Sequence, residues 1–350
     1  MALTAATAFL FTGTYVHANA ATAQSDSSST SATTTVSTAA VSDVVTAANT
    51  FLNTLSTSQK SQVLLSFTKA NAIAWSNLPC GSTCRVGIQF STLSSTQLAA
   101  AKAVVQAATG TGSGTGYDQV SQILAADDIL GKSASGYGSG NYYLAFLGTP
   151  STSGTWQLHF GGHHLAVNLT YKNGQVEGTT PYFVGVEPSS WTSNGTTYAP
   201  LSGMRNAMLA MLSSLSSSQL SQAKLSTSFS DVLLGPGKDG QFPTTKQGLA
   251  VSGLSSAQQA LVLAAITPWA KVADDTTSAS LLATYQSELA STYISYSGSS
   301  ALSSQGDYVR IDGPGVWIEF VCQNGVVYSG VHYHTVYRDH TRDYGGEFSF

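Results

Sequence analysis

Six histidines, gathered in two short runs, are the residues of this chain best suited to chemistry, because imidazole both binds metals and carries protons. One run is L-H-F-G-G-H-H-L and the other is V-H-Y-H-T-V-Y-R-D-H-T-R-D-Y. The six residues are His159, His163, His164, His332, His334 and His340. Charged side chains make up only 9% of the chain, so few other groups offer this chemistry. We expect the two runs to meet at one site.

Spacing within the runs indicates a metal site. In a strand, His332 and His334 would point to the same side with Cα atoms about 7 Å apart, close enough for two imidazoles to reach one ion. His163 and His164 are adjacent, so a strand there would turn only one of them toward the site, although the two preceding glycines could relax this rule. The predicted metal ligands are His163, His164, His332 and His334. Such a set suits zinc or copper.

Other polar residues near these runs complete the predicted site. Glu187 and Asp339 are the candidates to take a proton, and Arg338 is the candidate to bind an anionic group or orient a ligand. The predicted supporting residues are Asn168, His159, His340 and Arg342. Three alternatives remain open, namely a metal-free acid/base or anion site, purely structural histidines, and internal Arg-Asp ion pairs at 338–339 and 342–343. The pair Asp127-Asp128 is interpreted as a solvated helix end.

Four copies of L-S-x-x-Q indicate where helices begin. Ser as N-cap and Gln three residues later form a capping box, and the preceding Leu packs against the first turn. The four Ser residues are Ser56, Ser94, Ser216 and Ser255. The third copy follows the first by 160 residues and the fourth follows the second by 161, which indicates an internal duplication. Trp156 and Trp317, also 161 residues apart, are expected to be equivalent.

The predicted fold class is α+β, because helices precede strands in each half. The halves are expected at about 41–200 and 201–350, paired about a pseudo-two-fold axis into one compact unit. The last helix of each half is predicted around 117–130 and 281–293. The expected strands are 142–147, 155–160, 165–171 and 182–186, then 308–312, 316–322, 326–328 and 332–337.

Composition bounds the partners. With 14 Lys plus Arg and a net charge of −4, the chain lacks the basic footprint of a nucleic-acid-binding protein. No apolar run of the mature chain approaches the roughly 20 residues of a membrane span. The expected partner is a small-molecule or polymeric extracellular substrate.

The N-terminal region indicates secretion. Residues 2–20 are apolar and end in A-N-A and A-T-A, which suits a signal peptide over 1–23, although without the usual basic start. A Ser/Thr-rich linker over 24–40 follows. The expected location is extracellular or periplasmic; the alternative is a poorly ordered tail on a cytosolic protein. Cys80 and Cys84 are close enough to close a small disulfide loop, which would leave Cys322 over.

Three segments carry a family resemblance: G-G-H-H-L-A-V-N, P-Y-F-V-G-V-E-P and H-Y-H-T-V-Y-R-D-H-T-R-D-Y-G-G. From about Val41 to its end, the chain resembles a mostly secreted bacterial and fungal family, catalogued as domain of unknown function thirty-five hundred. The resemblance supports one duplicated unit. It also implies a shared site at His163, His164, Asn168, Glu187, His332, His334, Arg338 and Asp339. It implies no reaction.

The predicted function is therefore a secreted metal-dependent enzyme, with hydrolysis slightly ahead of oxidation. One alternative is a non-catalytic extracellular module that binds metal, glycan or peptide at the same histidine site. Another is a surface scaffold or adhesin.

Overall fold

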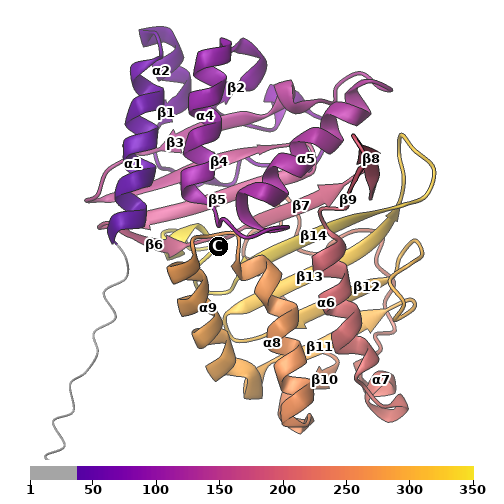
Figure 1. Cartoon of the computed structure of the whole chain (residues 1–350). Helices are drawn as coiled ribbons and strands as arrows, with labels where there is room; N and C mark the ends of the chain where they lie inside the picture. Colours follow the sequence, from indigo (N-terminus) through magenta and orange to yellow (C-terminus); the bar gives the residue numbers. More distant parts are fainter. Residues whose placement is uncertain (1–37) are drawn as a thin grey trace, which may run out of the picture. The chain divides into compact units, whose positions relative to one another are not determined.

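A twelve-stranded sheet runs through residues 38–350, the part of the chain that the computed structural model describes (Figure 1). Its order is β1-β3-β4-β5-β7-β14-β13-β12-β11-β10, with β2 paired to β3 and β6 to β5. The pairs are antiparallel except β1 with β3. A separate hairpin is formed by β8 and β9. The strands are β1 (Leu64–Leu65), β2 (Ile88–Gln89), β3 (Tyr143–Leu147), β4 (Thr155–Gly162), β5 (Leu165–Lys172), β6 (Gln175–Gly178), β7 (Tyr182–Val186), β8 (Trp191–Ser193), β9 (Thr196–Tyr198), β10 (Leu249–Ala250), β11 (Tyr293–Ser297), β12 (Tyr308–Asp312), β13 (Val316–Asn324) and β14 (Val331–Asp339).

Nine helices lie within the described residues, and the six longer ones cover one face of the sheet (Figure 1). They are α1 (Thr38–Asn53), α2 (Thr57–Val63), α3 (Lys69–Ala72), α4 (Ser95–Ala108), α5 (Gly116–Gly131), α6 (Ser202–Ser213), α7 (Ser217–Ala223), α8 (Ser256–Ala270) and α9 (Asp275–Glu288). All four predicted capping boxes are present, at the starts of α2, α4, α7 and α8. The α+β class is confirmed.

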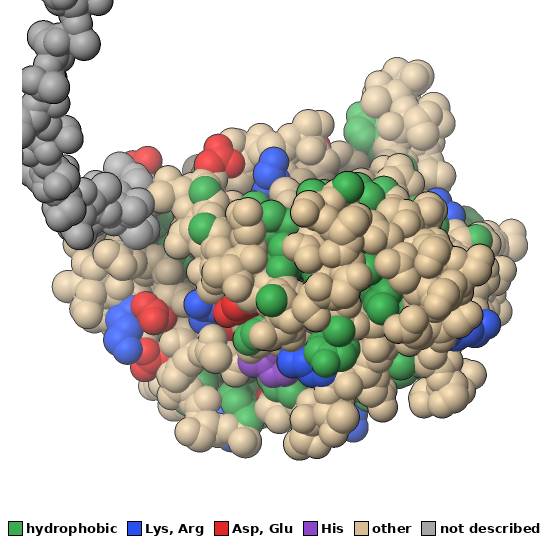
Figure 2. Space-filling view, turned by 90° about the horizontal axis from the view of Figure 1, so that it is seen from below, with side chains coloured by type: hydrophobic (Ala, Val, Ile, Leu, Met, Phe, Trp, Pro, Cys, Tyr) green, Lys and Arg blue, Asp and Glu red, His purple; other side chains and the backbone are tan. Residues whose placement is uncertain are grey.

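The other face of the sheet is covered by irregular segments. A smaller apolar cluster there contains Trp75, which follows α3, Phe183 and Val336 from the central strands, and Tyr344 from the C-terminal region. The outer surface carries few charged side chains on the face drawn in Figure 2, in keeping with the composition. This irregular side of the sheet is where the histidines gather.

The central strand pair β7–β14 joins the strands of the two sequence halves. It is antiparallel, with His334 opposite Gly185 and Tyr337 opposite Tyr182. Alternate residues of β14 therefore point to opposite faces. Val336, which shares a face with His334, packs on the irregular side, whereas Tyr337 packs against the helices.

Three details differ from the predictions. The helix predicted to reach Tyr293 ends at Glu288, and a strand that was not predicted, β11, begins at Tyr293. Residues 326–328 belong to the loop between β13 and β14 and not to a strand. The tryptophans are not equivalent: Trp156 stacks on Tyr171 in the helix-side core, whereas Trp317 contacts Arg310 and Glu319.

Among the described residues, no helix combines the length and apolarity that crossing a membrane requires. The predicted signal peptide and most of the predicted linker lie outside the described residues. Cys80 and Cys84 form a disulfide, and Cys322 is a buried free cysteine.

Candidate metal centre

Three buried histidines from both sequence halves converge on one point. The Nε2 atoms of His164 and His334 are 3.1 Å apart, and those of His332 and His334 are 3.2 Å apart. One ring nitrogen from each of the three residues lies within 4.8 Å of the others. We call these residues the histidine triad; it can hold a metal ion. The prediction that the two histidine runs meet is confirmed.

The distances fit a tetrahedral ion. Zinc–imidazole bonds of about 2.05 Å at tetrahedral angles place neighbouring nitrogens about 3.3 Å apart. The two measured separations, 3.1 and 3.2 Å, are close to that value. Three protein ligands would leave a fourth position for water or another ligand.

Local backbone geometry places each ring. His332 and His334 are alternate residues of β14 and so share a face. His164 sits in the β4–β5 turn with a φ of 62°, and its carbonyl accepts a hydrogen bond of 2.7 Å from the N–H of Gly185. A Cβ at Gly185 would lie 2.7 Å from the His164 ring and 3.0 Å from the His334 ring. Only glycine at this position leaves the space that the two imidazoles occupy.

Asp231 fixes the orientation of the central ring. Its Oδ1 lies 2.9 Å from Nδ1 of His334. Burial would raise the pKa of Asp231, but the hydrogen bonds from His334 and from the N–H of Val232 outweigh that effect and lower it. An ionised carboxylate accepts a hydrogen bond from Nδ1–H, which leaves Nε2 of His334 to face the centre of the triad.

Burial keeps the rings of His164 and His332 neutral at pH 7. Burial, reinforced by the charges of neighbouring histidines, lowers the pKa of His332 to about 4 and holds the pKa of His164 well below its ordinary value. Neutral imidazole is the form that binds metal, because its lone pair is free.

His163, a predicted ligand, lies beside the triad and not in it. Its ring stacks on that of His164 at a centroid distance of 3.7 Å, and its Nδ1 lies 2.6 Å from Oδ1 of Asp127. Asp127 also accepts a 2.8 Å hydrogen bond from the N–H of Gly138. The interpretation of Asp127 as a solvated helix end is wrong, because the residue is buried and paired with His163.

Two buried charges hold the segment that carries Asp231. Glu319 accepts hydrogen bonds from the N–H groups of Leu233 and Leu234 at 2.5 and 2.8 Å. Arg338 donates to the carbonyls of Leu234 and Gly235 at 2.8 and 3.0 Å. These bonds, which we call the clamp, fix the backbone two to four residues beyond Asp231 through both its N–H groups and its carbonyls.

The structure does not bring Arg338 to the triad as a catalytic group. Besides the clamp bonds, its guanidinium pairs with Asp239 at 2.9 Å and Asp343 at 3.0 Å, in full burial. All of its contacts are internal, so the alternative of an internal ion pair describes it better.

Asp339 and Arg342 also lie elsewhere. Asp339 is an odd-numbered residue of β14, so it points to the helix side, opposite His334. It accepts hydrogen bonds from Tyr285 at 2.8 Å and from Arg342 at 2.9 Å. The prediction of Asp339 as a proton acceptor at the histidine site is therefore wrong.

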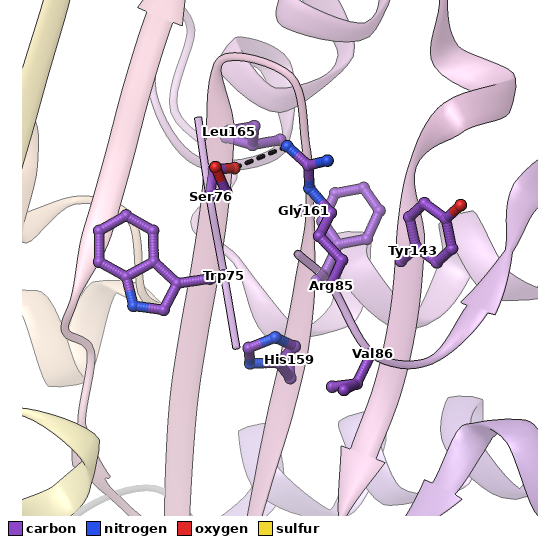
Figure 3. A pocket seen from close by; sticks show the side chains of 9 residues that line it. Trp75, Ser76, Arg85, Val86, Tyr143, His159, Gly161 and Leu165 are labelled. Atoms are coloured by element: carbon purple, nitrogen blue, oxygen red, sulfur yellow. Dashed lines mark hydrogen bonds between the residues drawn. The ribbon is translucent and has the colours of Figure 1, made fainter. Parts of the chain in front are cut away.

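His159, Asn168 and His340 are separate from the triad as well. His159 faces a cavity of about 10 Å³ that Trp75 and Arg85 also line (Figure 3). Its Nε2 lies 3.1 Å from the carbonyl of Ala74. Burial lowers its pKa to about 4. Asn168, opposite His159 on β5, donates to the carbonyl of Pro181 at 2.8 Å. His340 stacks on Phe242 and lies 3.3 Å from Asp312.

Glu187 is the predicted catalytic residue that shares a cavity with the triad. The cavity has a volume of about 180 Å³ and lies between the end of β7 and the β13–β14 loop, with Glu187 and His332 in its wall. Oε1 of Glu187 accepts hydrogen bonds from the N–H groups of Val327 and Tyr328, both at 2.7 Å. The carboxylate thus ties the loop to the end of β7 while facing the same space as a triad histidine.

Residues 37–346 match the protein family described as Protein of unknown function (DUF3500). The chain belongs to that family. No curated protein and no solved structure matches it. The DUF3500 region contains all three triad histidines together with Glu187 and Asp231.

Proposed function

We propose that this chain is a secreted metal-dependent enzyme whose ion is bound by His164, His332 and His334. The observation that carries the proposal is the convergence of three buried Nε2 atoms, two pairs of which are 3.1 and 3.2 Å apart. An all-imidazole set of this kind suits zinc or copper.

Hydrolysis is favoured over oxidation because a carboxylate lies in the cavity beside the triad. A bound zinc ion lowers the pKa of its water toward about 7. Glu187, fixed through Oε1 by two backbone N–H groups, is the group in the cavity wall that can take a proton. His332 borders the same cavity, so a substrate there would reach the triad from one side.

The alternative is an extracellular module that binds metal and ligand without turnover. One observation favours it: both hydrogen bonds of Glu187 go to the loop, as in a residue whose role is to hold that loop in place. In that case the cavity would bind a ligand, and Glu187 would take no proton from it.

We also propose that the two halves, 41–200 and 201–350, arose by duplication. Gln59 and Gln97 bond each other through their side chains, and Gln97 caps the carbonyl of Thr54 at 2.9 Å. Gln219 and Gln258 repeat this arrangement, with Gln258 bonded to the carbonyl of Ser214 at 2.8 Å. The strand order is symmetric as well, since β3-β4-β5-β7 meets β14-β13-β12-β11. The triad lies at this junction and draws ligands from both halves.

Secretion is supported by the Cys80–Cys84 disulfide, since disulfides persist in oxidising compartments. Expression with the N-terminal region intact, followed by N-terminal sequencing of the exported protein, tests it. A mature start near residue 24 is expected, and full-length protein retained in the cytosol would contradict the proposal.

The proposed metal site is tested by elemental analysis of protein purified without added metal. One equivalent of zinc or copper is expected, falling below about a tenth in His334→Ala because three ligands are needed to hold the ion. His340→Ala is the matched control and should keep its metal, since His340 contacts Phe242 and Asp312. Equal metal in both variants would contradict the site.

Catalysis is tested with Glu187→Gln. The amide oxygen of Gln can still accept the two backbone N–H groups, so fold and metal content should remain while turnover in a hydrolase substrate screen is lost. If the wild type binds ligand in the cavity but turns nothing over, the alternative of a binding module stands.

A further inference from the structure

A second cavity lies beside the metal cavity, on the far side of one short segment. It has a volume of about 250 Å³ and is formed by the β8–β9 hairpin and α5. Ser190 lines the metal cavity, whereas the next residue, Trp191, lines the second one. The two cavities are therefore neighbours along the chain.

Helix α5 connects the two cavities in space. Asp118, Gln122 and Ala125 line the hairpin cavity, and the carbonyl of Ile129 accepts a 3.2 Å hydrogen bond from the hydroxyl of Tyr328, which lines the metal cavity. These four positions follow the 4, 3 and 4 spacing of one helix face. From Gln122 to Ile129 the helix rises about 10 Å. Figure 1 shows the β8–β9 hairpin beside α5.

The hairpin cavity combines aromatic planes with hydrogen-bonding groups. Trp191 and Tyr198 are cross-strand partners whose rings stack at 5.4 Å and 16°. Both side chains are half-buried, as are Asp118 and Gln122 across the cavity. Aromatic walls with a few placed polar groups are typical of small-molecule sites.

The metal cavity is lined instead by small polar groups. Besides Glu187 and His332, its wall contains Ser189, Ser190, Ser329 and Tyr328. Of the described residues, no Lys or Arg lines either cavity, while Glu187 and Asp118 bring negative charge. A phosphate or carboxylate would meet no cation there, and a large apolar ligand would leave the hydroxyl groups unpaired.

We infer that the ligand is a neutral glycan chain lying along α5, with one sugar unit in the metal cavity and a neighbouring unit against Trp191. A sugar ring presents C–H groups on its faces, which pack on an aromatic plane, and hydroxyl groups at its rim, which pair with carboxylates, amides and hydroxyls. This ligand matches both cavities at once. The inference rests on the proposed function for the unit beside the triad; the aromatic cavity needs no metal.

The test measures binding of neutral hexasaccharides to the full chain by calorimetry. The probes are cellohexaose, xylohexaose, mannohexaose and chitohexaose, with polygalacturonate as the anionic comparison. At least one neutral probe should bind, and Trp191→Ala should weaken it by about tenfold or more, equivalent to about 1.4 kcal/mol. Binding of none of the four, or a preference for the polyanion, would overturn the inference.

Thr192→Ala is the matched control. Thr192 pairs with Thr197 on the other face of the hairpin at 3.2 Å, so its loss perturbs the hairpin without touching the aromatic face. Affinity should stay within about twofold of the wild type, because the aromatic contacts remain. Equal weakening by Thr192→Ala and Trp191→Ala would mean that the aromatic pair only supports the hairpin, which overturns the inference.

His334→Ala separates this inference from the proposed function. Loss of metal with glycan affinity kept within about threefold supports both, because the aromatic contacts do not depend on the ion. Glycan binding by a wild type that holds no metal would contradict the proposed function alone. A metal-loaded wild type that binds no glycan would contradict the inference alone.

Discussion

Asp231 should control metal affinity although it would not touch the ion. Its carboxylate lies 2.9 Å from Nδ1 of His334 and sets which nitrogen of that ring carries the proton. Partners of this kind change metal affinity by about 10–100-fold when they are removed. Since the Asp231 side chain is 44% exposed, solvent screens part of its charge, and a loss near the lower limit is expected for a change in charge alone.

Two substitutions separate the contribution of the Asp231 charge to metal affinity from that of its hydrogen-bond acceptor. Asp231→Asn keeps an oxygen that can accept a hydrogen bond from Nδ1–H but removes the charge. We therefore expect a dissociation constant for the metal about tenfold larger, equivalent to about 1.4 kcal/mol. Asp231→Ala removes the acceptor as well and should approach about 100-fold, or about 2.7 kcal/mol. The order of the two variants is itself a prediction.

The assay is competition between the protein and a chromophoric chelator at fixed pH and salt. Asp128→Asn is the control, because Asp128 is exposed and caps the N–H of Ser139 at 2.7 Å without contacting a histidine. Urea unfolding of the metal-free proteins checks that the fold is retained. If both Asp231 variants bind metal within about twofold of the wild type, the loss of affinity is far smaller than expected, and the assigned role of the carboxylate is refuted.

Further predictions follow from packing and charge. Gly185→Ala should abolish metal binding, because the new Cβ would lie 2.7 Å from one triad ring, whereas Gly203→Ala, which meets nothing within 4 Å, should bind normally in the same titration. His159 has a pKa of about 4 in the folded chain, below its unfolded value, so its contribution to the free energy of unfolding should fall by roughly 3 kcal/mol as the pH drops from 6.5 to 4. His159→Gln should flatten that part of the stability curve in urea titrations at each pH; an unchanged slope would contradict the assignment. Glu319→Gln should weaken metal binding through the Asp231 segment, so it should add little in an Asp231→Asn background, and full additivity in the double-mutant cycle would contradict the clamp.

Local signals in the sequence were sufficient for much of the fold. The capping boxes at Ser56, Ser94, Ser216 and Ser255 predicted four helix starts because N-cap and N3 residues act within one turn. Strand alternation likewise predicted that His332 and His334 share a face. Strand β11 was missed because Y-I-S-Y-S follows a helix directly and mixes Ser with apolar residues, a pattern that does not mark a strand's start.

Contacts between residues far apart in the sequence could not be predicted from local patterns. Asp231 lies in a segment without regular structure and meets His334 across 103 residues of chain, so no periodicity connects them. Asp127 was interpreted together with Asp128 as a solvated helix end, whereas the β4–β5 turn brings His163 against it. Such pairings depend on how the irregular segments fold back over the sheet.

One miss could have been avoided. Alternation along β14 places Asp339 on the face opposite His334, so the same rule that paired His332 with His334 excludes Asp339 from the site. The choice between His163 and His164 could not be made from alternation, because His164 adopts a positive φ in a turn and leaves the strand geometry.

Anomalous diffraction at the absorption edge of zinc and of copper tests the central claim most directly, on crystals of protein purified without added metal. We predict one peak bonded to Nε2 of His164, His332 and His334, at about 2.0–2.1 Å from each. Absence of a peak there, with the three rings hydrogen-bonded to one another or turned apart, would contradict the metal centre.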